Sequence, residues 1–416
     1  MNRRTVLGLI GASGALWGTC GSAARGQREQ EVEGAKGPRF FELKGHRFPV
    51  LAAGFDRAGA RIATGSLDRT LTIWDAATGL DRPILFHDFP VHAVAFSPDG
   101  KRVASGAPER AFVAPPSKVE MVVGAVEPGR PQPPVFFINP RRQKLDSYHE
   151  GGVIRVWDIE ACRPVVTWGG MGASPKALAF SRDGRTLACL DHRLVLTLHD
   201  AGNGREIARM AEHRAGDEPG LSAVSKEGFS ADARRVVSIS HVIRGKNSWG
   251  GDVFRTVILL WDAAARRVRT IEHSSGAVAI SPDGGRVAAG NVGDRGDGLT
   301  FFDFETGAVL RTAAFAGRGD PNVAGPIFLA FSPDGSRLAV SHARGPLAIH
   351  DGVTGERLQW VERPRPDQGE VRAVAFSDGW LHVVEGGVDF SDEWDRERSF
   401  KKLGPLVTWR SPLERR

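Results

Sequence analysis

Residues 95–107 read AFSPDGKRVASGA, and this stretch decides the fold. An apolar run ends at Phe96, the residues Ser-Pro-Asp-Gly follow, and a second apolar run starts at Val103. Pro98 presets a backbone angle suited to a tight turn, and Gly100 can take the left-handed conformation at the corner of the turn. The stretch therefore predicts a β-hairpin, which is a strand, a tight turn and a second strand.

The same hairpin recurs along the chain. Six further copies, some close and some weak, begin at Gly54, Ala179, Gly228, Ala279, Ala330 and Ala375. Together with the first stretch they make seven hairpins in a chain of 416 residues. Regular repetition of this kind indicates a repeat architecture, in which each unit buries its apolar faces against its neighbours.

The composition agrees with a turn-rich all-β protein. The chain contains 51 glycines and 25 prolines, and no long helical period interrupts its short apolar runs. The net charge of +6 is small for this length and is not gathered into a basic run. Because nucleic-acid-binding proteins cluster their basic residues on one face, we expect no nucleic-acid partner.

A third apolar run follows each hairpin and ends, in most copies, with an aromatic residue or His before an Asp. The clearest runs are TLTIWD, VIRVWD and VILLWD, which end at Asp75, Asp158 and Asp262. The first copy also contains Gly-His at residues 45–46 and Ser-Leu-Asp ending at Asp68. These motifs resemble the WD-repeat family of β-propellers over residues 39–410, although only the first copy has the Gly-His pair.

The resemblance implies an all-β, seven-bladed β-propeller of four-stranded antiparallel blades. It also implies that an N-terminal strand, which we place in RFFELKG at residues 39–45, closes the last blade and hides its sheet edge. It further implies a structural hydrogen-bond network within the blades, with Thr64 or Ser66 as a hydroxyl partner. The residues assigned to this network are His46, Asp68, Trp74, Asp75, Trp157, Asp158, Trp261 and Asp262.

The spacing within the repeats locates the insertions. From the hairpin aromatic residue to the residue before the closing Asp, the gap is 19 in three copies and 61, 32, 22 and 33 in the others. Because the hairpin turns stay short, the extra residues must lie between the second and third strands. In an antiparallel blade these connections share one rim with the connections to the next blade. The largest insertion covers about residues 108–150.

Long loops on a rigid scaffold commonly carry function, so we expect an interaction surface on this rim. Cations beside aromatic side chains in such loops could hold an anionic or sugar ligand. The candidate rim residues are Tyr148 and His149 in the largest insertion, Arg244, Lys246 and Trp249 in the fourth repeat, and Trp394 in the seventh.

Two functions remain open. The first is a non-catalytic scaffold that binds a protein or peptide through the long-looped rim, as a monomeric propeller. The second is an exported enzyme or small-ligand sensor with a site at the rim mouth of the central channel. The chain lacks G-x-S-x-G, H-E-x-x-H, a P-loop and the C-x-x-C spacing of zinc sites. We therefore expect no catalytic residue, no cofactor and no metal, and favour the scaffold.

The N-terminus has the features of an export signal. Arg3 and Arg4 precede an uncharged run at residues 5–24, which ends in small residues, and the pair resembles the twin-arginine type. We expect a signal at residues 1–24, a flexible linker at 25–38 and the propeller at 39–416, in the periplasm or cell envelope of a bacterium. An uncleaved anchor and lipidation at Cys20 remain alternatives, and only these would bring the protein to a membrane.

Overall fold

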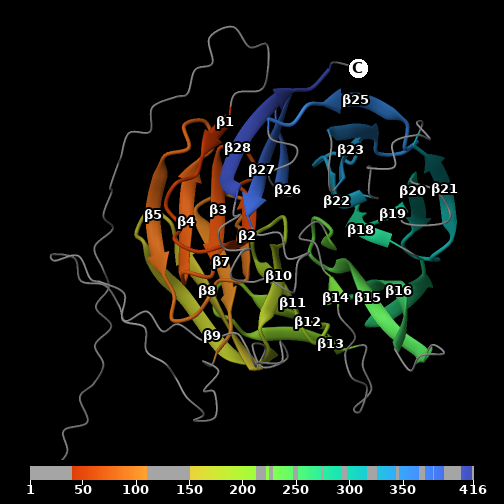
Figure 1. The fold of residues 1–416 in the computed structure, drawn as a ribbon. Helices are drawn as coiled ribbons and strands as arrows, with labels where there is room; N and C mark the ends of the chain where they lie inside the picture. The colour runs from red at the N-terminus through yellow and green to blue at the C-terminus, as the bar shows by residue number, and fades with distance from the viewer. Residues whose placement is uncertain are drawn as a thin grey trace, which may run out of the picture.

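The computed structural model describes residues 40–109, 150–211, 222–223, 228–246, 252–273, 275–291, 298–315, 326–342, 346–364, 371–377, 379–387 and 404–414. Within these residues, 28 strands form seven four-stranded antiparallel sheets. Figure 1 shows the sheets as blades around a common axis. The predicted all-β, seven-bladed propeller is confirmed.

In the first four blades the strands follow one another in sequence across each sheet. Blade one contains β2 (Val50–Phe55), β3 (Arg61–Ser66), β4 (Thr70–Asp75) and β5 (Asp81–Phe86). Blade two contains β6 (Ala93–Phe96), β7 (Arg102–Ala107), β8 (Glu150–Asp158) and β9 (Arg163–Ala173). Blade three contains β10 (Pro175–Phe180), β11 (Thr186–Asp191), β12 (Val195–Asp200) and β13 (Glu206–Ala211). Blade four contains β14 (Ser222–Ala223), β15 (Arg235–Lys246), β16 (Asp252–Asp262) and β17 (Arg267–Glu272).

Blades five and six repeat this order, and blade seven closes the ring. Blade five contains β18 (Ser275–Ile280), β19 (Arg286–Asn291), β20 (Gly298–Asp303) and β21 (Val309–Ala314). Blade six contains β22 (Pro326–Phe331), β23 (Arg337–His342), β24 (Leu347–Asp351) and β25 (Arg357–Val361). Blade seven contains β26 (Val371–Ser377), β27 (Trp380–Gly387), β28 (Gly404–Pro412) and β1 (Phe40–Glu42). Because β1 pairs with β28, with Phe41 opposite Thr408, the N-terminal strand closes the last blade as predicted (Figure 1).

The core lies between the blades. Val50 and Trp74 of blade one, for example, pack with Ala373 and Val384 of blade seven. The blades approach so closely that a Cβ atom on Gly65 would lie 2.5 Å from the Val91 side chain of the next blade. Each blade therefore has both faces covered by its neighbours, and its strand edges and the connections at either end of the sheet remain for other contacts.

The connections between strands divide the propeller into two rims. The first strand joins the second, and the third joins the fourth, through tight turns on what we name the short-turn rim. The other connections lie on the opposite rim, which we name the loop-bearing rim. They include residues 108–149 between β7 and β8 and residues 388–403 between β27 and β28.

Blade four departs from the expected pattern. The spacing places its extra residues in a loop, but the structure extends both arms of the hairpin, to 12 residues in β15 and 11 in β16. His241 lies opposite Thr256, and Lys246 lies opposite Asp252. Apolar and β-branched residues in both arms favour this continued pairing. Arg244 and Lys246, which the sequence analysis places in a loop, therefore lie in a strand.

Candidate functional site at the loop-bearing rim

The six predicted rim residues fall in two groups. Arg244 and Lys246 lie on the extension of β15, which projects the hairpin of blade four beyond its neighbours' strand lengths. Tyr148, His149, Trp249 and Trp394 lie outside the described residues. The other side chains that the structure describes on the loop-bearing rim are therefore ones that the sequence analysis did not select for binding.

The hydrogen-bond network predicted for blade one attaches two connections of this rim to the sheet. They are the segment before β2, which contains His46, and the turn between β3 and β4, which contains Asp68. His46, in the segment before β2, bonds through Nδ1 to the Asp68 carboxylate at 3.0 Å and through Nε2 to Thr64 Oγ1 at 2.6 Å. Trp74 Nε1 donates to the same Thr64 hydroxyl at 2.7 Å. Burial alone would raise the pKa of Asp68, but the hydrogen bond and charge of His46, together with hydrogen bonds from Thr70 and the Arg47 backbone N–H, outweigh burial and lower that pKa. Because these side chains bond to one another, the network stabilises the rim.

Blade two contains a second such histidine that the sequence analysis misses. His87 Nε2 bonds to Ser105 Oγ at 2.9 Å, and Trp157 Nε1 donates to the same hydroxyl at 2.8 Å. Burial, followed by the charge of Arg155, lowers the pKa of His87 to about 3, so its ring is neutral at neutral pH. His87 precedes Val91 by four residues, as His46 precedes the matching residue of blade one, and that spacing is the signal that could have found it.

The Trp–hydroxyl pair is present in only some blades. In blade four, Trp261 Nε1 donates to Ser238 Oγ at 3.0 Å. In blades three, five and six the Trp position holds His199, Phe302 and His350, and the hydroxyl position holds Cys189, Ala289 and Val340. In these three blades the Trp and its hydroxyl partner are replaced together. Blade seven differs, because it keeps Trp409 with Glu385 at the hydroxyl position, and Trp409 Nε1 is buried without a hydrogen-bond partner among the described residues.

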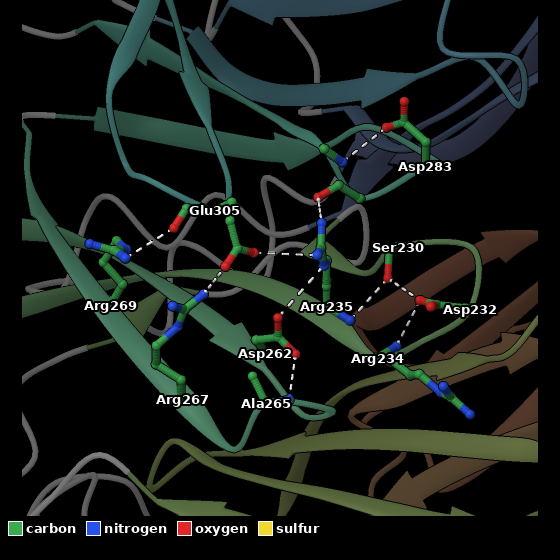
Figure 2. A network of polar contacts seen from close by, with 12 residues as sticks. Ser230, Asp232, Arg234, Arg235, Asp262, Ala265, Arg267, Arg269, Asp283 and Glu305 are labelled. Atoms are coloured by element: carbon green, nitrogen blue, oxygen red, sulfur yellow. Dashed lines mark hydrogen bonds and ion pairs between the residues drawn. The ribbon is translucent and has the colours of Figure 1, made fainter.

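The predicted aspartates at the ends of third strands lie on the short-turn rim, away from the loops. The carboxylates of Asp75, Asp158 and Asp262 each accept the backbone N–H of a residue two or three positions later. Figure 2 shows one of these bonds, from Ala265 to Asp262 at 2.9 Å. These residues shape the turns.

Each hairpin turn on the short-turn rim is also held by its own side chains. In five blades the Ser of the turn donates its hydroxyl to the Asp two residues later, in the pairs Ser97–Asp99, Ser181–Asp183, Ser230–Asp232, Ser281–Asp283 and Ser332–Asp334. In blade six the Ser332 hydroxyl, partly opposed by burial, lowers the pKa of Asp334 to about 2. The turn carboxylates are thus occupied within their own turns.

Arginines link neighbouring blades across the same rim, which sequence reasoning also misses. Figure 2 shows Arg235, at the start of β15, donating to the Gly284 carbonyl of blade five at 3.1 Å and facing Glu305 at 3.4 Å. Arg286, at the same position of blade five, donates to the Gly352 carbonyl of blade six at 2.6 Å. The sequence signal is an Arg at the start of the second strand in five blades, at Arg61, Arg102, Arg235, Arg286 and Arg337.

Basic and imidazole groups meet at the inner end of the loop-bearing rim, between blades two and three. His92, directly before β6, bonds through Nδ1 to Ser174 Oγ at 3.2 Å, and its ring lies 5.9 Å from that of His192. Burial lowers the pKa of Lys176, two residues after Ser174, to about 8. Ser174 is fully buried, so its hydroxyl supports His92 and is not presented to a substrate. The described residues include no group of three or more His, Cys, Asp or Glu placed to hold a metal.

The comparisons with known proteins agree with this architecture. The family model described as "WD domain, G-beta repeat" matches residues 37–75 and 84–109, which contain blade one and the start of blade two. The chain forms a seven-bladed β-propeller whose first repeats match this family model. A solved chain from "Structure of U3-55K" superposes on this propeller with a TM-score of 0.59 and 14% identity, covering 90% of this chain and 98% of that one. At this identity the likeness shows the fold alone.

The relatives found by sequence share one short segment with this propeller. "WD repeat-containing protein 1" of Mus musculus and of Bos taurus are each 33% identical to it over 66 residues, which is 16% of this chain. The match spans 11% of the length of these relatives. WD-repeat propellers in general are non-catalytic scaffolds for protein–protein interaction, and this is the coarse function that the fold supports.

Proposed function

We propose that this WD-repeat propeller is a non-catalytic scaffold of the bacterial cell envelope that binds a protein or peptide through its loop-bearing rim. One observation carries the proposal: the long connections all leave the sheets on one rim. Between second and third strands they are residues 108–149, 247–251, 292–297 and 388–403, and between blades they include residues 212–221 and 316–325.

The opposite rim supports the assignment by contrast. Its turn carboxylates are bonded within their own turns, and its arginines reach the turns of the next blade. A partner would have to break these contacts to use the same groups. On the loop-bearing rim, extra residues lengthen loops or, in blade four, the arms of one hairpin, while each blade keeps four strands, so this rim can diversify for recognition without loss of the fold.

The envelope part of the proposal rests on the leader. The paired Arg3 and Arg4 and the uncharged residues 5–24 support export, and these residues lie outside the described part of the chain. Among the residues that the structure describes, no helix has the length and apolar character needed to cross a membrane.

A second candidate is a small-ligand site, enzymatic or sensory, at the mouth of the channel. The observation that favours it is Lys176, whose pKa of about 8 would leave part of the amine uncharged near neutral pH. His92, bonded to Ser174 two residues before Lys176, places an imidazole on the same rim. The scaffold remains preferred because the buried hydroxyl of Ser174 offers no nucleophile beside these groups.

Quantitative capture from the native envelope tests the scaffold. The baits are residues 25–416, the same chain with residues 110–148 replaced by a short Gly-Ser turn, and a control with Lys101→Gln and Arg182→Gln on the short-turn rim. Thermal unfolding checks each fold first. We expect one protein to be retained by the full chain and the control, and lost from the trimmed chain. Retention of the same proteins by all three baits would contradict the proposal.

A further inference from the structure

The hydrogen-bond network of blade one has counterparts in blade two at a constant offset of 41 residues. The corresponding pairs are His46 with His87, Val50 with Val91, Ile62 with Val103, and Thr64 with Ser105. The two sets share one register, because Trp74 pairs with Ile62 and Trp157 pairs with Val103. By the same offset, Glu109 occupies in blade two the place that Asp68 occupies in blade one.

The two acids make different contacts. The Asp68 carboxylate bonds to His46 Nδ1 at 3.0 Å. In blade two the corresponding atom, His87 Nδ1, is buried and has no hydrogen-bond partner among the residues that the structure describes. The Glu109 carboxylate instead accepts the backbone N–H of Gly170 at 2.9 Å. The acid of blade two therefore contacts β9, the outermost strand of the blade, and not the histidine (Figure 1).

Two sequence changes account for the different path. Leu67 of blade one donates its N–H to the Pro49 carbonyl at 2.9 Å, which ties the turn to the segment before β2. Pro108 stands at the corresponding position of blade two and has no N–H, so this bond cannot form there. Glu109 is also one methylene longer than Asp68, so its carboxylate can reach as far as β9.

Glu109 lies in a notch formed by three glycines, which are Gly151 of β8 and Gly169 and Gly170 of β9. We name these three residues the glycine notch. A Cβ atom on Gly151 would lie 3.0 Å from the Glu109 Cβ, and one on Gly169 would lie 3.0 Å from Glu109 Oε1. Because both distances are shorter than ordinary contacts between carbon or oxygen atoms, larger residues here would crowd the glutamate.

The outer strand of blade two is shaped to form this notch. β9 has 11 residues, whereas the outer strands of blades one, three, four and five have six each. Its pairing with β8 shifts between Gly152 and Ile154, which leaves Gly169 and Gly170 opposite one residue of β8. Gly170 has a φ of 78°, a conformation that glycine adopts readily. This bulge interrupts the ladder, and Glu109 accepts the N–H of Gly170.

The glycine notch lies at the base of the largest insertion. Glu109 is the last described residue before the insertion, and Glu150 and Gly151 are the first described residues after it. The notch therefore joins the departing chain, the returning chain and β9 at one point. It also places Glu109 over the outer half of the blade, since β8 and β9 are its third and fourth strands. A binding element held at its base loses less conformational entropy when it binds a partner.

We propose that Glu109 is a positioning residue for partner binding, because its contact with the glycine notch fixes the base of the connection between β7 and β8. The inference rests on the proposed function, since it assigns the orientation of the longest connection on the same rim. An acid that served only the blade would complete the bond to His87, as Asp68 does with His46. Glu109 leaves that bond unmade and holds the connection instead.

Residue-resolved hydrogen exchange on residues 25–416 tests the contact itself. The Gly170 amide should exchange at least about fivefold faster after Glu109→Ala, because its acceptor is lost. Glu109→Gln keeps an acceptor oxygen and should restore part of the protection. Glu160→Ala removes an exposed carboxylate from the short-turn rim of the same blade and should not change Gly170. Equal exchange of Gly170 in the unaltered and Glu109→Ala chains would overturn the proposal.

Capture from the native envelope tests the positioning. The protein retained by residues 25–416 should be retained at least about fivefold less by Glu109→Ala and by Gly169→Val, which fills the notch. The two changes together should be no worse than either alone, because both break one contact. Glu160→Ala should retain the protein fully, and the unfolding temperature of the Glu109→Ala chain should stay within about 2 °C of the unaltered chain. Full retention by the Glu109→Ala chain would overturn the proposal, even if Gly169→Val folds poorly.

The chain with residues 110–148 replaced separates this proposal from the scaffold. If that replacement abolishes capture while Glu109→Ala leaves it intact, the rim scaffold stands and the positioning role of Glu109 is wrong. If the replacement leaves capture intact, the scaffold proposal fails. The positioning role then fails with it, and a faster exchange of Gly170 in Glu109→Ala would leave Glu109 a structural role alone.

Discussion

The two rims of the propeller are built from the same strands but differ in what their connections do. On the short-turn rim, Ser281 bonds to Asp283 within its turn, and Arg286 reaches the next blade. On the loop-bearing rim, the connections vary from a few residues to the 42 between β7 and β8. The difference indicates that the short-turn rim is held by contacts within the propeller, whereas the loop-bearing rim can vary to suit a partner.

The largest effect is expected from the hydrogen bonds that support the loop-bearing rim. Thr64→Val leaves Trp74 Nε1 and His46 Nε2 without their shared partner, and each lost bond to a buried group is worth about 1–2 kcal/mol. We expect the free energy of unfolding, measured with denaturant, to fall by about 3 kcal/mol. Thr64→Ser keeps the hydroxyl and should recover most of this loss. If Thr64→Val lowers the free energy of unfolding as little as Thr64→Ser does, the Thr64 hydroxyl does not stabilise the rim.

Acid should weaken both rims through buried histidines. Burial is the first cause that lowers the pKa of His87, beneath the loop-bearing rim, to about 3, and that of His350, beside the short-turn rim, to about 4. Because both folded pKa values lie below the unfolded value, stability is full above about pH 6.5 and is lost as the pH falls toward 4.

Denaturant titrations at a series of pH values measure this loss. From about pH 7 to about pH 5 we expect a decrease of roughly 4 kcal/mol in the free energy of unfolding, about 2 kcal/mol for each histidine. His87→Gln and His350→Gln should each remove part of the pH dependence of the free energy of unfolding. The two variants therefore measure how much each rim contributes to it. A free energy that stays flat over this range would contradict neutral, buried imidazoles at both sites.

The arginine links should matter for stability and not for binding. Arg286→Ala removes the donor to the Gly352 carbonyl and should lower the free energy of unfolding by about 1.5 kcal/mol. The matched control is Arg185→Ala, an exposed arginine of the same rim in blade three, where Thr186 stands at the linking position. Capture of the envelope partner should be unchanged in both variants, and a loss of capture with Arg286→Ala would contradict a purely structural role for the short-turn rim.

The smallest effect is expected at a strained turn of the short-turn rim. Arg266 has a φ of 50°, at the turn position where blades one, three, five and six have glycine. Arg266→Gly should raise the free energy of unfolding by about 1 kcal/mol, because side chains are disfavoured in this conformation. Ala265→Gly, at the preceding residue, lacks that strain and should bring no gain. Equal responses to the two substitutions would mean that the turn stores no strain.

The sequence predicts the fold better than the site. Seven hairpins, the closing strand at residues 39–45 and the absence of helical periodicity follow from local patterns, and the structure agrees. The register shifts near the start of the inner strands depend on pairing with a second strand, which no local pattern states. Lys176 reads in sequence as an ordinary strand residue, and only the pairing shows that the register shifts there, between Pro175 and Ala177.

Contacts between blades explain the other differences. In the sequence, Arg286 resembles any charged residue after a turn. Only the structure shows the Gly352 carbonyl of the next blade beside it. His87 lacks the preceding glycine of the family motif, so its role appears only when Ser105 and Trp157 surround it. Arg244 was assigned to a loop by repeat length, which cannot distinguish a loop from a longer pair of strands.

Photo-cross-linking in the native envelope tests the division between the rims most directly. A photoreactive residue is placed at Arg193, exposed between β11 and β12 on the loop-bearing rim, or at Arg182, exposed in the hairpin turn of the same blade on the short-turn rim. We predict a discrete cross-linked partner from position 193 and none from position 182. A partner joined from position 182 alone, or equally from both positions, would contradict binding through the loop-bearing rim.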